Sequence, residues 1–241
     1  MSEVTEVKEV KVKKVVKTKY SVKKSTKRKF TQQIRVKDEI LASGLFEGVV
    51  PSLAFECKQE EIINEINHNF KFLMIDNDAE TYKKMVNIGL DMFPENPPSF
   101  HFGNLSNIIF NAKEDSFTHC LFDYCNGFED HKDEVIHVMN NKIVGVGGLV
   151  FFTFCLRNNS YEHKKFIAEM ESIAPFNPTY INVKQYNQAE QMAMIDDCKT
   201  VQAYRTFLVG EIGKERCWQI LDIPTYRDGT PMALIILKRI K

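Results

Sequence analysis

Short apolar segments alternate with amphipathic segments along most of the chain from Phe30 onward. A run of mostly apolar residues predicts a buried strand, whereas apolar residues three and four positions apart predict a helix. Five segments in the first two thirds of the chain predict strands: Gly48–Glu56, Phe70–Ile75, Ser99–Phe102, Phe117–Phe122 and Gly147–Phe154. The second of these is apolar at nearly every position, which is typical of a strand that is covered on both faces.

Segments between these strands carry a helical pattern. The expected helices are Asp38–Leu45, Cys57–Asn67, Ala79–Leu90 and Lys132–Asn141. Gly44 can end the first of them, because glycine adopts the left-handed conformation that terminates helices. Asn77 can cap the third. Strands that alternate with helices in this way predict a parallel sheet with helices on both faces.

The last third of the chain follows a different pattern. A helical segment, Asn187–Tyr204, precedes two strand-like segments, Trp218–Tyr226 and Met232–Ile240. Asp228-Gly229 lies between the two strands and is a strong hairpin signal, because glycine tolerates the positive φ of a tight turn. The predicted fold class is therefore α/β: a Rossmann-like, mainly parallel sheet with helices on both faces and a C-terminal antiparallel hairpin.

The composition favours one large domain, which we expect to cover residues 34–241. The 241 residues are 44% hydrophobic, enough to fill a sizeable core. The longest apolar stretch, Ile143–Leu156, is too short for a transmembrane helix, and the N-terminus lacks the apolar core of a signal peptide. The six cysteines form no CxxC pair, which favours a reducing compartment. We therefore expect a soluble cytoplasmic protein that does not bind membranes.

The net charge is zero, but the charges are unevenly distributed. Residues 1–29 contain eleven Lys and Arg against three Glu, a net charge of +8, so the remainder carries −8. This composition predicts a disordered basic arm over residues 1–33. Residues 8–29 could bind nucleic acid through its phosphates, or they could serve only as a solubilising tail. The basic run at 23–29 would also fit a nuclear import signal.

Four stretches at the ends of the predicted strands share a further pattern. They are Phe72–Asp78 (FLMIDND), Phe102–Leu105 (FGNL), Leu121–Cys125 (LFDYC) and Gly148–Phe154 (GLVFFTF). In order and spacing they resemble strands two to five of the class I S-adenosylmethionine-dependent methyltransferases. The resemblance covers Val49–Lys241 and implies a methyltransferase that uses S-adenosyl-L-methionine.

The resemblance implies a cofactor site at the carboxyl ends of the strands. Asp76, with Asp78 as a substitute, would accept hydrogen bonds from the ribose hydroxyls. Gly103 and Asn104 stand where the family often has a Gly-Asp pair that meets the adenine amino group, and an asparagine oxygen can accept the same bond. The alternative is that Asp76 and Asn104 serve only as helix-cap or turn residues.

The first strand departs from the family pattern. Most members follow it with a glycine-rich turn, whereas this chain has Ser52-Leu-Ala54-Phe-Glu56-Cys57. Ser52 and Ala54 are small enough to let the methionine part of the cofactor approach the backbone. The departure leaves a second hypothesis open, a methyltransferase-like subunit with a degenerate cofactor site that binds nucleic acid or protein.

Asp123 and Tyr124 follow the fourth strand, where family members place groups that orient the methyl acceptor. The resemblance therefore implies them as catalytic residues of an in-line methyl transfer, in which positioning supplies most of the rate. The basic arm makes nucleic acid the expected acceptor. No metal site is expected, because His131 and His137 are six positions apart and lie on different faces of the predicted helix.

Overall fold

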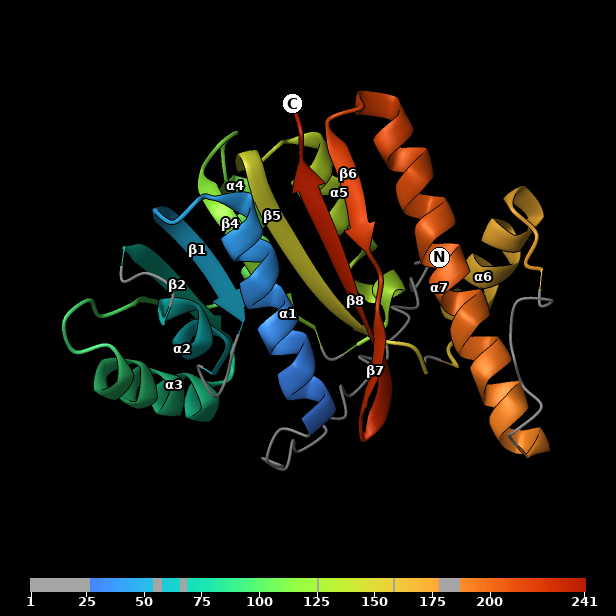
Figure 1. Cartoon of the computed structure of the whole chain (residues 1–241), viewed down its shortest axis with the longest axis horizontal. Helices are drawn as coiled ribbons and strands as arrows, with labels where there is room; N and C mark the ends of the chain where they lie inside the picture. Colours follow the sequence, from blue (N-terminus) through green and yellow to red (C-terminus); the bar gives the residue numbers. More distant parts are fainter. Residues whose placement is uncertain (1–26, 54–57, 66–68, 125, 158, 178–186) are drawn as a thin grey trace, which may run out of the picture.

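A single twisted sheet runs through the molecule, and helices cover both of its faces (Figure 1). The computed structural model describes residues 27–53, 58–65, 69–124, 126–157, 159–177 and 187–241. The strands are β1 (Gly48–Leu53), β2 (Phe70–Asp76), β3 (Ser99–Phe102), β4 (Phe117–Asp123), β5 (Val144–Cys155), β6 (Trp218–Asp222), β7 (Thr225–Asp228) and β8 (Thr230–Arg239). They lie in the order β3-β2-β1-β4-β5-β8-β6, with β7 paired to β8.

The sheet is parallel from β3 to β5 and antiparallel beyond β5. The chain builds the sheet outward from β1 in both directions, first through β2 and β3 and then through β4 and β5. Ligands of open α/β sheets bind at such a switch point, beyond the carboxyl ends of the strands. β7 and β8 form a hairpin whose turn is at Gly229, with a φ of 74°. The predicted fold class and its C-terminal hairpin are confirmed.

The helices are divided between the two faces of the sheet (Figure 1). One face carries α1 (Lys27–Ser43), α2 (Lys58–Asn64) and α3 (Ala79–Met92). The other carries α4 (Leu105–Asn111), α5 (Lys132–Asn140), α6 (Tyr161–Ile173) and α7 (Gln188–Glu215). Phe151 and Phe152 of β5 belong to different cores, because successive strand residues point to opposite faces. Within the described ranges, no helix has the length and apolar character needed to cross a bilayer.

Helix α1 begins earlier than the sequence predicted. The pattern indicated a helix from Asp38, but the helix begins at Lys27 and so includes residues assigned to the basic arm. Gln33, Val36 and Ile40 form its buried stripe, and their spacing of three and four positions lets them pack together against α2 and the sheet. The many charges around this stripe concealed it. Residues 27–33 therefore belong to the folded domain, and the rest of the predicted arm lies outside the described residues.

Three further sequence predictions need correction. The N-cap of α3 is Asp78 and not Asn77, because the Asp78 carboxylate accepts the backbone hydrogen bond. The predicted strand at 218–226 is two strands, since the chain is irregular at Pro224, a residue that cannot donate a ladder hydrogen bond. Helix α7 continues as far as Glu215. The sequence also did not predict α4 and α6.

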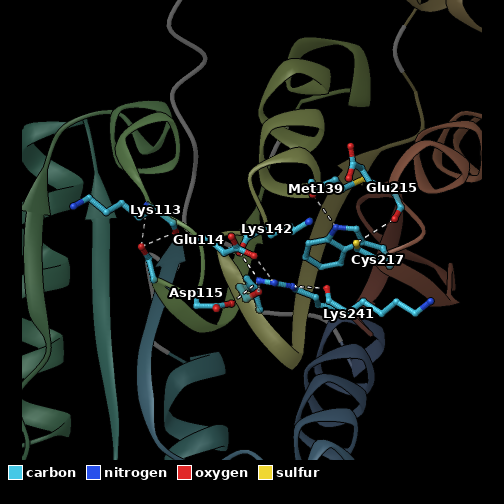
Figure 2. Close-up of polar contacts among 12 residues, drawn as sticks. Lys113, Glu114, Asp115, Met139, Lys142, Glu215, Cys217 and Lys241 are labelled. Carbon is cyan, nitrogen blue, oxygen red and sulfur yellow. Dashed lines mark hydrogen bonds and ion pairs between the residues drawn. The ribbon is translucent and has the colours of Figure 1, made fainter.

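The loops that enter β4 and β5 bind one buried arginine, and Figure 2 labels three of its partners, Glu114, Asp115 and Lys142. Arg239 of β8 is only 3% exposed. Its guanidinium donates to the backbone oxygens of Lys142 and Val144, each at 2.7 Å, and to the carboxylates of Glu114 and Asp115. These bonds fix the loops that enter β4 and β5, at the edge opposite the carboxyl ends.

Candidate functional site

Three of the predicted cofactor residues come together at the carboxyl ends of β2 and β3. The two strands pair in parallel as far as Asp76, and the N–H of Gly103 donates a hydrogen bond of 2.9 Å to the backbone oxygen of Asp76. This bond places Asn104, the next residue, beside the end of β2. A side chain at position 103 would meet His101, since a Cβ there would lie 2.8 Å from its Nε2. Glycine therefore leaves room for the His101 side chain, which would have to move if position 103 carried a Cβ.

The Asp76 carboxylate is partly buried and keeps acceptor capacity. Its Oδ1 accepts the backbone N–H of Asp78 at 2.7 Å. Burial raises the pKa of Asp76, and this hydrogen bond opposes the increase. A carboxylate has lone pairs for about four hydrogen bonds. The group can therefore accept the two hydroxyls of a diol in addition to the bond it already has.

Asp78 and Asn104 each stand at the start of a helix, but their side chains differ in availability. Asp78 caps α3 by accepting the backbone N–H of Thr81 at 3.0 Å, so its carboxylate serves as a helix cap. Asn104 is at the N-cap position of α4 but makes no capping bond with its side chain. Its Oδ1 instead accepts a hydrogen bond from Asn77 Nδ2. The Asn104 amide is thus directed to the chain that leaves β2.

A buried glutamate lies at the switch point, and the sequence analysis did not identify it. Glu60 of α2 is completely buried, and its Oε1 accepts a hydrogen bond from Ser52 Oγ near the end of β1. Its Oε2 has no hydrogen-bond partner among the described residues. Burial raises the pKa of Glu60 to about 7, and the bond from Ser52 opposes the rise. Glu60 precedes the buried Ile63 by three positions, which was the available signal that it shares the inner face of α2.

The same hydrogen bond defines the position of Ser52. Its side chain is fully buried and donates to Glu60, so it joins the end of β1 to α2 inside the protein. The other residue predicted to admit the cofactor, Ala54, lies outside the described residues, as does Cys125.

Asp123 lies at the carboxyl end of β4 in a polar network. Lys29 of α1 donates from Nζ to Asp123 Oδ2 at 3.1 Å, and Thr153 of β5 donates to Asp123 Oδ1. Lys29 Nζ also lies 3.8 Å from Asp228 Oδ2 in the β7–β8 hairpin. The start of α1 therefore reaches over the carboxyl ends of the strands. The sequence analysis missed this role of Lys29 because it assigned the residue to the arm.

The strand register shows that Asp76 and Asp123 lie at the same level of the sheet. Ser52 pairs with Met74 of β2 and with Leu121 of β4, and each aspartate lies two residues beyond its partner. β1 separates the two strands, so their axes are about 10 Å apart. An extended ligand along this edge can therefore contact both carboxylates.

Tyr124 is buried, although the sequence predicted it beside the acceptor. It is 5% exposed, and its ring stacks on His131 with centroids 3.8 Å apart. His131 Nδ1 lies 2.9 Å from Glu134 Oε2, and Ser106 donates to the other oxygen of that carboxylate. Burial raises the pKa of Tyr124 well above its ordinary value. Tyr124 therefore packs beneath the end of β4, in place of the predicted contact with the acceptor.

In the part of the chain that the structure describes, no three His, Cys, Asp or Glu side chains form a group that could hold a metal ion.

Solved structures of other proteins share this arrangement of strands and helices. A candidate rRNA methylase from Clostridium thermocellum has a TM-score of 0.51 and 8% identity over 90% of this chain and 98% of its own. The fold is methyltransferase-like. A candidate methylase from Haemophilus influenzae has a TM-score of 0.52 and 7% sequence identity, over 86% of this chain and 89% of its own. The N-methyltransferase NodS from Bradyrhizobium japonicum has a TM-score of 0.50 and 7% sequence identity, over 88% of this chain and 96% of its own.

The likeness of this methyltransferase-like chain to other proteins is one of structure and not of sequence. No protein-family model matches it, and no curated protein does. The likeness therefore establishes the fold, and the argument for function depends on the residues at the carboxyl edge of the sheet.

Proposed function

We propose that the protein binds S-adenosyl-L-methionine at the carboxyl ends of β1, β2 and β3 and transfers its methyl group to an acceptor. The observation that carries the proposal is the grouping of Asp76, Gly103 and Asn104 at this edge of a methyltransferase-like sheet. Asp76 would accept the ribose hydroxyls, and the Asn104 oxygen would accept the adenine amino group after exchange with Asn77. When bound, the cofactor supplies a methyl group activated by a sulfonium.

Asp123 is the residue that we propose to orient the acceptor. It lies level with Asp76 on the other side of β1, and Thr153 holds one of its oxygens. The other oxygen, which now pairs with Lys29, would accept an N–H or O–H of the acceptor. Methyl transfer from a sulfonium needs an aligned nucleophile, so positioning of the acceptor by Asp123 would supply most of the rate.

Nucleic acid is the proposed acceptor. The basic segment 1–29 carries +8, and its last residues, Lys27–Lys29, begin α1 at the carboxyl edge of the sheet. Phosphates attracted by this charge would therefore be held beside Asp123.

A specific observation favours a second candidate, a degenerate methyltransferase-like subunit that binds nucleic acid or protein. Where most family members have a glycine-rich turn, this chain has a buried carboxyl group, Glu60, bonded to Ser52. Lys29 also pairs with Asp123. Both features could keep a cofactor or an acceptor out of the crevice.

Transfer of labelled methyl groups tests the first candidate against the second. Protein incubated with methyl-labelled S-adenosylmethionine and mixed cellular RNA or DNA is expected to label the nucleic acid. Asp76→Ala should raise the KM for the cofactor, whereas Asp123→Asn should lower kcat. Binding of nucleic acid without any label transfer, by protein that also fails to bind the cofactor, would favour the degenerate subunit.

Removal of residues 1–26 tests the role of the arm without cutting α1. The shortened protein should keep its fold and its cofactor affinity, but bind RNA and DNA less tightly at low salt. Equal nucleic-acid affinity would reduce these residues to a solubilising tail.

A further inference from the structure

A polar hollow of about 340 Å³ lies beside the proposed site, between α1, α7 and the β7–β8 hairpin. Its floor contains the buried residues Leu156, Tyr226 and Pro231. Leu156 directly follows β5, so the hollow belongs to the same carboxyl edge as Asp123. Its volume is near the lower limit of small-ligand pockets, which suits one nucleotide and not a double helix.

One lysine connects this hollow to the proposed methyl-transfer site. Lys29 follows Arg28, which lines the hollow, and Lys29 pairs with Asp123. It also pairs with Asp228, the neighbour of Arg227, a second lining residue. A ligand in the hollow would therefore lie next to the acceptor-orienting carboxylate.

The charged groups at the hollow are of two kinds. Arg28 of α1 and Arg227 of β7 are exposed guanidinium groups, and guanidinium binds phosphate oxygens with two parallel hydrogen bonds. Asp197 of α7 also lines the hollow, is half-buried, and has its Oδ2 3.7 Å from Nη2 of Arg227. Burial raises the pKa of Asp197, while Arg227 and Arg157 oppose the increase. Cationic groups thus occupy the rim, and an acceptor carboxylate lies further in.

Gln32 adds a second polar group inside the hollow. Its Oε1 is buried and has no hydrogen-bond partner among the described residues. A buried amide oxygen without a partner costs free energy, so it marks a place where a ligand donor can bind. Gln32 and Asp197 together offer acceptors of the kind that bind the exocyclic amines of nucleobases.

We infer that this hollow binds one nucleotide of a single-stranded nucleic acid, with the base against Tyr226 and the flanking phosphates on Arg28 and Arg227. The inference rests on the proposed function, because it identifies where the acceptor strand would bind. The strand must be single or locally opened, since a base inside a duplex cannot enter a hollow without leaving the stack. Asp197 would accept an amine such as cytosine N4, which favours cytosine over uracil.

Binding of labelled single-stranded RNA and DNA to the full chain without cofactor, measured by fluorescence anisotropy over a range of salt concentrations, tests the inference. Arg28→Ala and Arg227→Ala should each weaken binding several-fold and reduce the magnitude of the slope of log affinity against log salt by about 0.7, the value for one phosphate contact on a single strand. Lys113→Ala is the matched control, because Lys113 is exposed in the loop before β4, at the opposite edge. Arginine variants that behave like this control would overturn the inference.

Base preference gives a second readout that a diffuse electrostatic surface would not show. The unchanged protein should bind oligo(C) more tightly than oligo(U), and Asp197→Asn should reduce this difference because its amide N–H can donate to uracil O4. Equal binding of the two oligomers by the unchanged protein would contradict the inference. A calorimetric titration with S-adenosylhomocysteine, run in parallel, reports the cofactor site independently, so failure of the hollow and failure of the proposed function give different results.

Discussion

Two buried ionisable side chains make the stability of this protein depend on pH in opposite directions. Glu60 has its pKa raised from 4.5 to about 7, so the folded state keeps a proton that the unfolded chain releases. Its contribution to stability is complete below pH 4.5 and is lost as the pH rises through 7. His119 has its pKa lowered from 6.5 to about 4 by burial, so its contribution is complete above 6.5 and is lost as the pH falls.

Glu60→Gln should remove the first dependence. The amide cannot ionise, so the variant should not lose stability as the pH rises. Its free energy of unfolding, relative to that of the unchanged protein, should therefore be about 3 kcal/mol higher at weakly alkaline pH than at acid pH. Urea unfolding at the two pH values measures this gain. Glu61→Gln, an exposed neighbour on the same helix, serves as the control and should show no such gain. A stability difference between Glu60→Gln and the unchanged protein that does not vary with pH would mean that folding does not raise the pKa of Glu60.

Burial keeps His119 neutral, and each of its two ring nitrogens makes one hydrogen bond. Its Nδ1 accepts the N–H of Leu149 at 3.1 Å, and its Nε2 lies 3.0 Å from the oxygen of Leu45, so Nε2 carries the proton. His119→Gln should therefore lose less stability than the unchanged protein as the pH falls from 6.5 to about 4, by about 3 kcal/mol. His101→Gln, on the partly exposed β3, is the matched histidine control. If the free energy of unfolding falls by the same amount between pH 6.5 and about 4 in all three proteins, His119 is not held neutral in the folded state.

At the scale of elements, β5 depends on a glycine at its close contact with β4. A Cβ on Gly148 would overlap the backbone oxygen of Thr118 and the side chain of Val144, next to the irregular register between β4 and β5. A Cβ on Gly145 would have only ordinary contacts, the nearest at 3.8 Å. Gly148→Ala should therefore cost about 3 kcal/mol of stability and Gly145→Ala less than about 1 kcal/mol, as measured by chemical unfolding. Equal costs would show that the strand shifts to accept a side chain.

Arg239 should stabilise the opposite edge of the sheet. Replacement by methionine removes the guanidinium donor from the oxygens of Lys142 and Val144, and the Lys142 oxygen keeps only the N–H of Asp115. The change should lower the free energy of unfolding by about 3 kcal/mol. Arg239→Lys should recover part of this loss, because lysine keeps the charge but lacks the planar fork. Lys238→Met, on the neighbouring residue, controls for the loss of a charge near the C-terminus. A methionine variant as stable as this control would mean that water replaces the guanidinium without cost.

Strands were easier to predict from the sequence than helices. Phe70–Ile75 is a largely buried apolar run, which leaves a local signal. Ser99–Phe102 is a short aromatic run at the edge of the sheet, and both segments agree with the structure to within a residue. Helix α1 was predicted too short because its buried stripe includes a glutamine, Gln33, among many lysines and arginines. Its packing against α2 and the sheet decides its length, and a local pattern does not contain that information.

At the scale of the whole molecule, the residues of the candidate site are of two kinds, those at strand ends, which the sequence predicted, and those on helices, which it did not. Asp76, Asn104 and Asp123 follow strands, so the chain order placed them at one edge of a parallel sheet. Glu60 and Lys29 come from helices, and their contacts with Ser52 and Asp123 arise only when α2 and α1 pack on the sheet. Sequence reasoning thus identified the residues carried by strand ends and missed those brought in by tertiary packing.

The carboxyl edge of the sheet therefore combines groups suited to a nucleoside with a buried carboxyl group at the switch point. The proposed function requires that S-adenosylmethionine binds to these groups despite the buried carboxyl group. Calorimetric titration of the full chain with S-adenosylhomocysteine tests this most directly, with Asp76→Ala as the test variant and Asp91→Ala, an exposed residue of α3, as the control.

We expect saturable binding to the unchanged protein and to Asp91→Ala. The affinity of Asp76→Ala should be at least about tenfold lower, because charge-assisted hydrogen bonds contribute about 1.5–3 kcal/mol. Absence of binding by well-folded protein, or equal affinity in the Asp76→Ala variant, would contradict the proposed function.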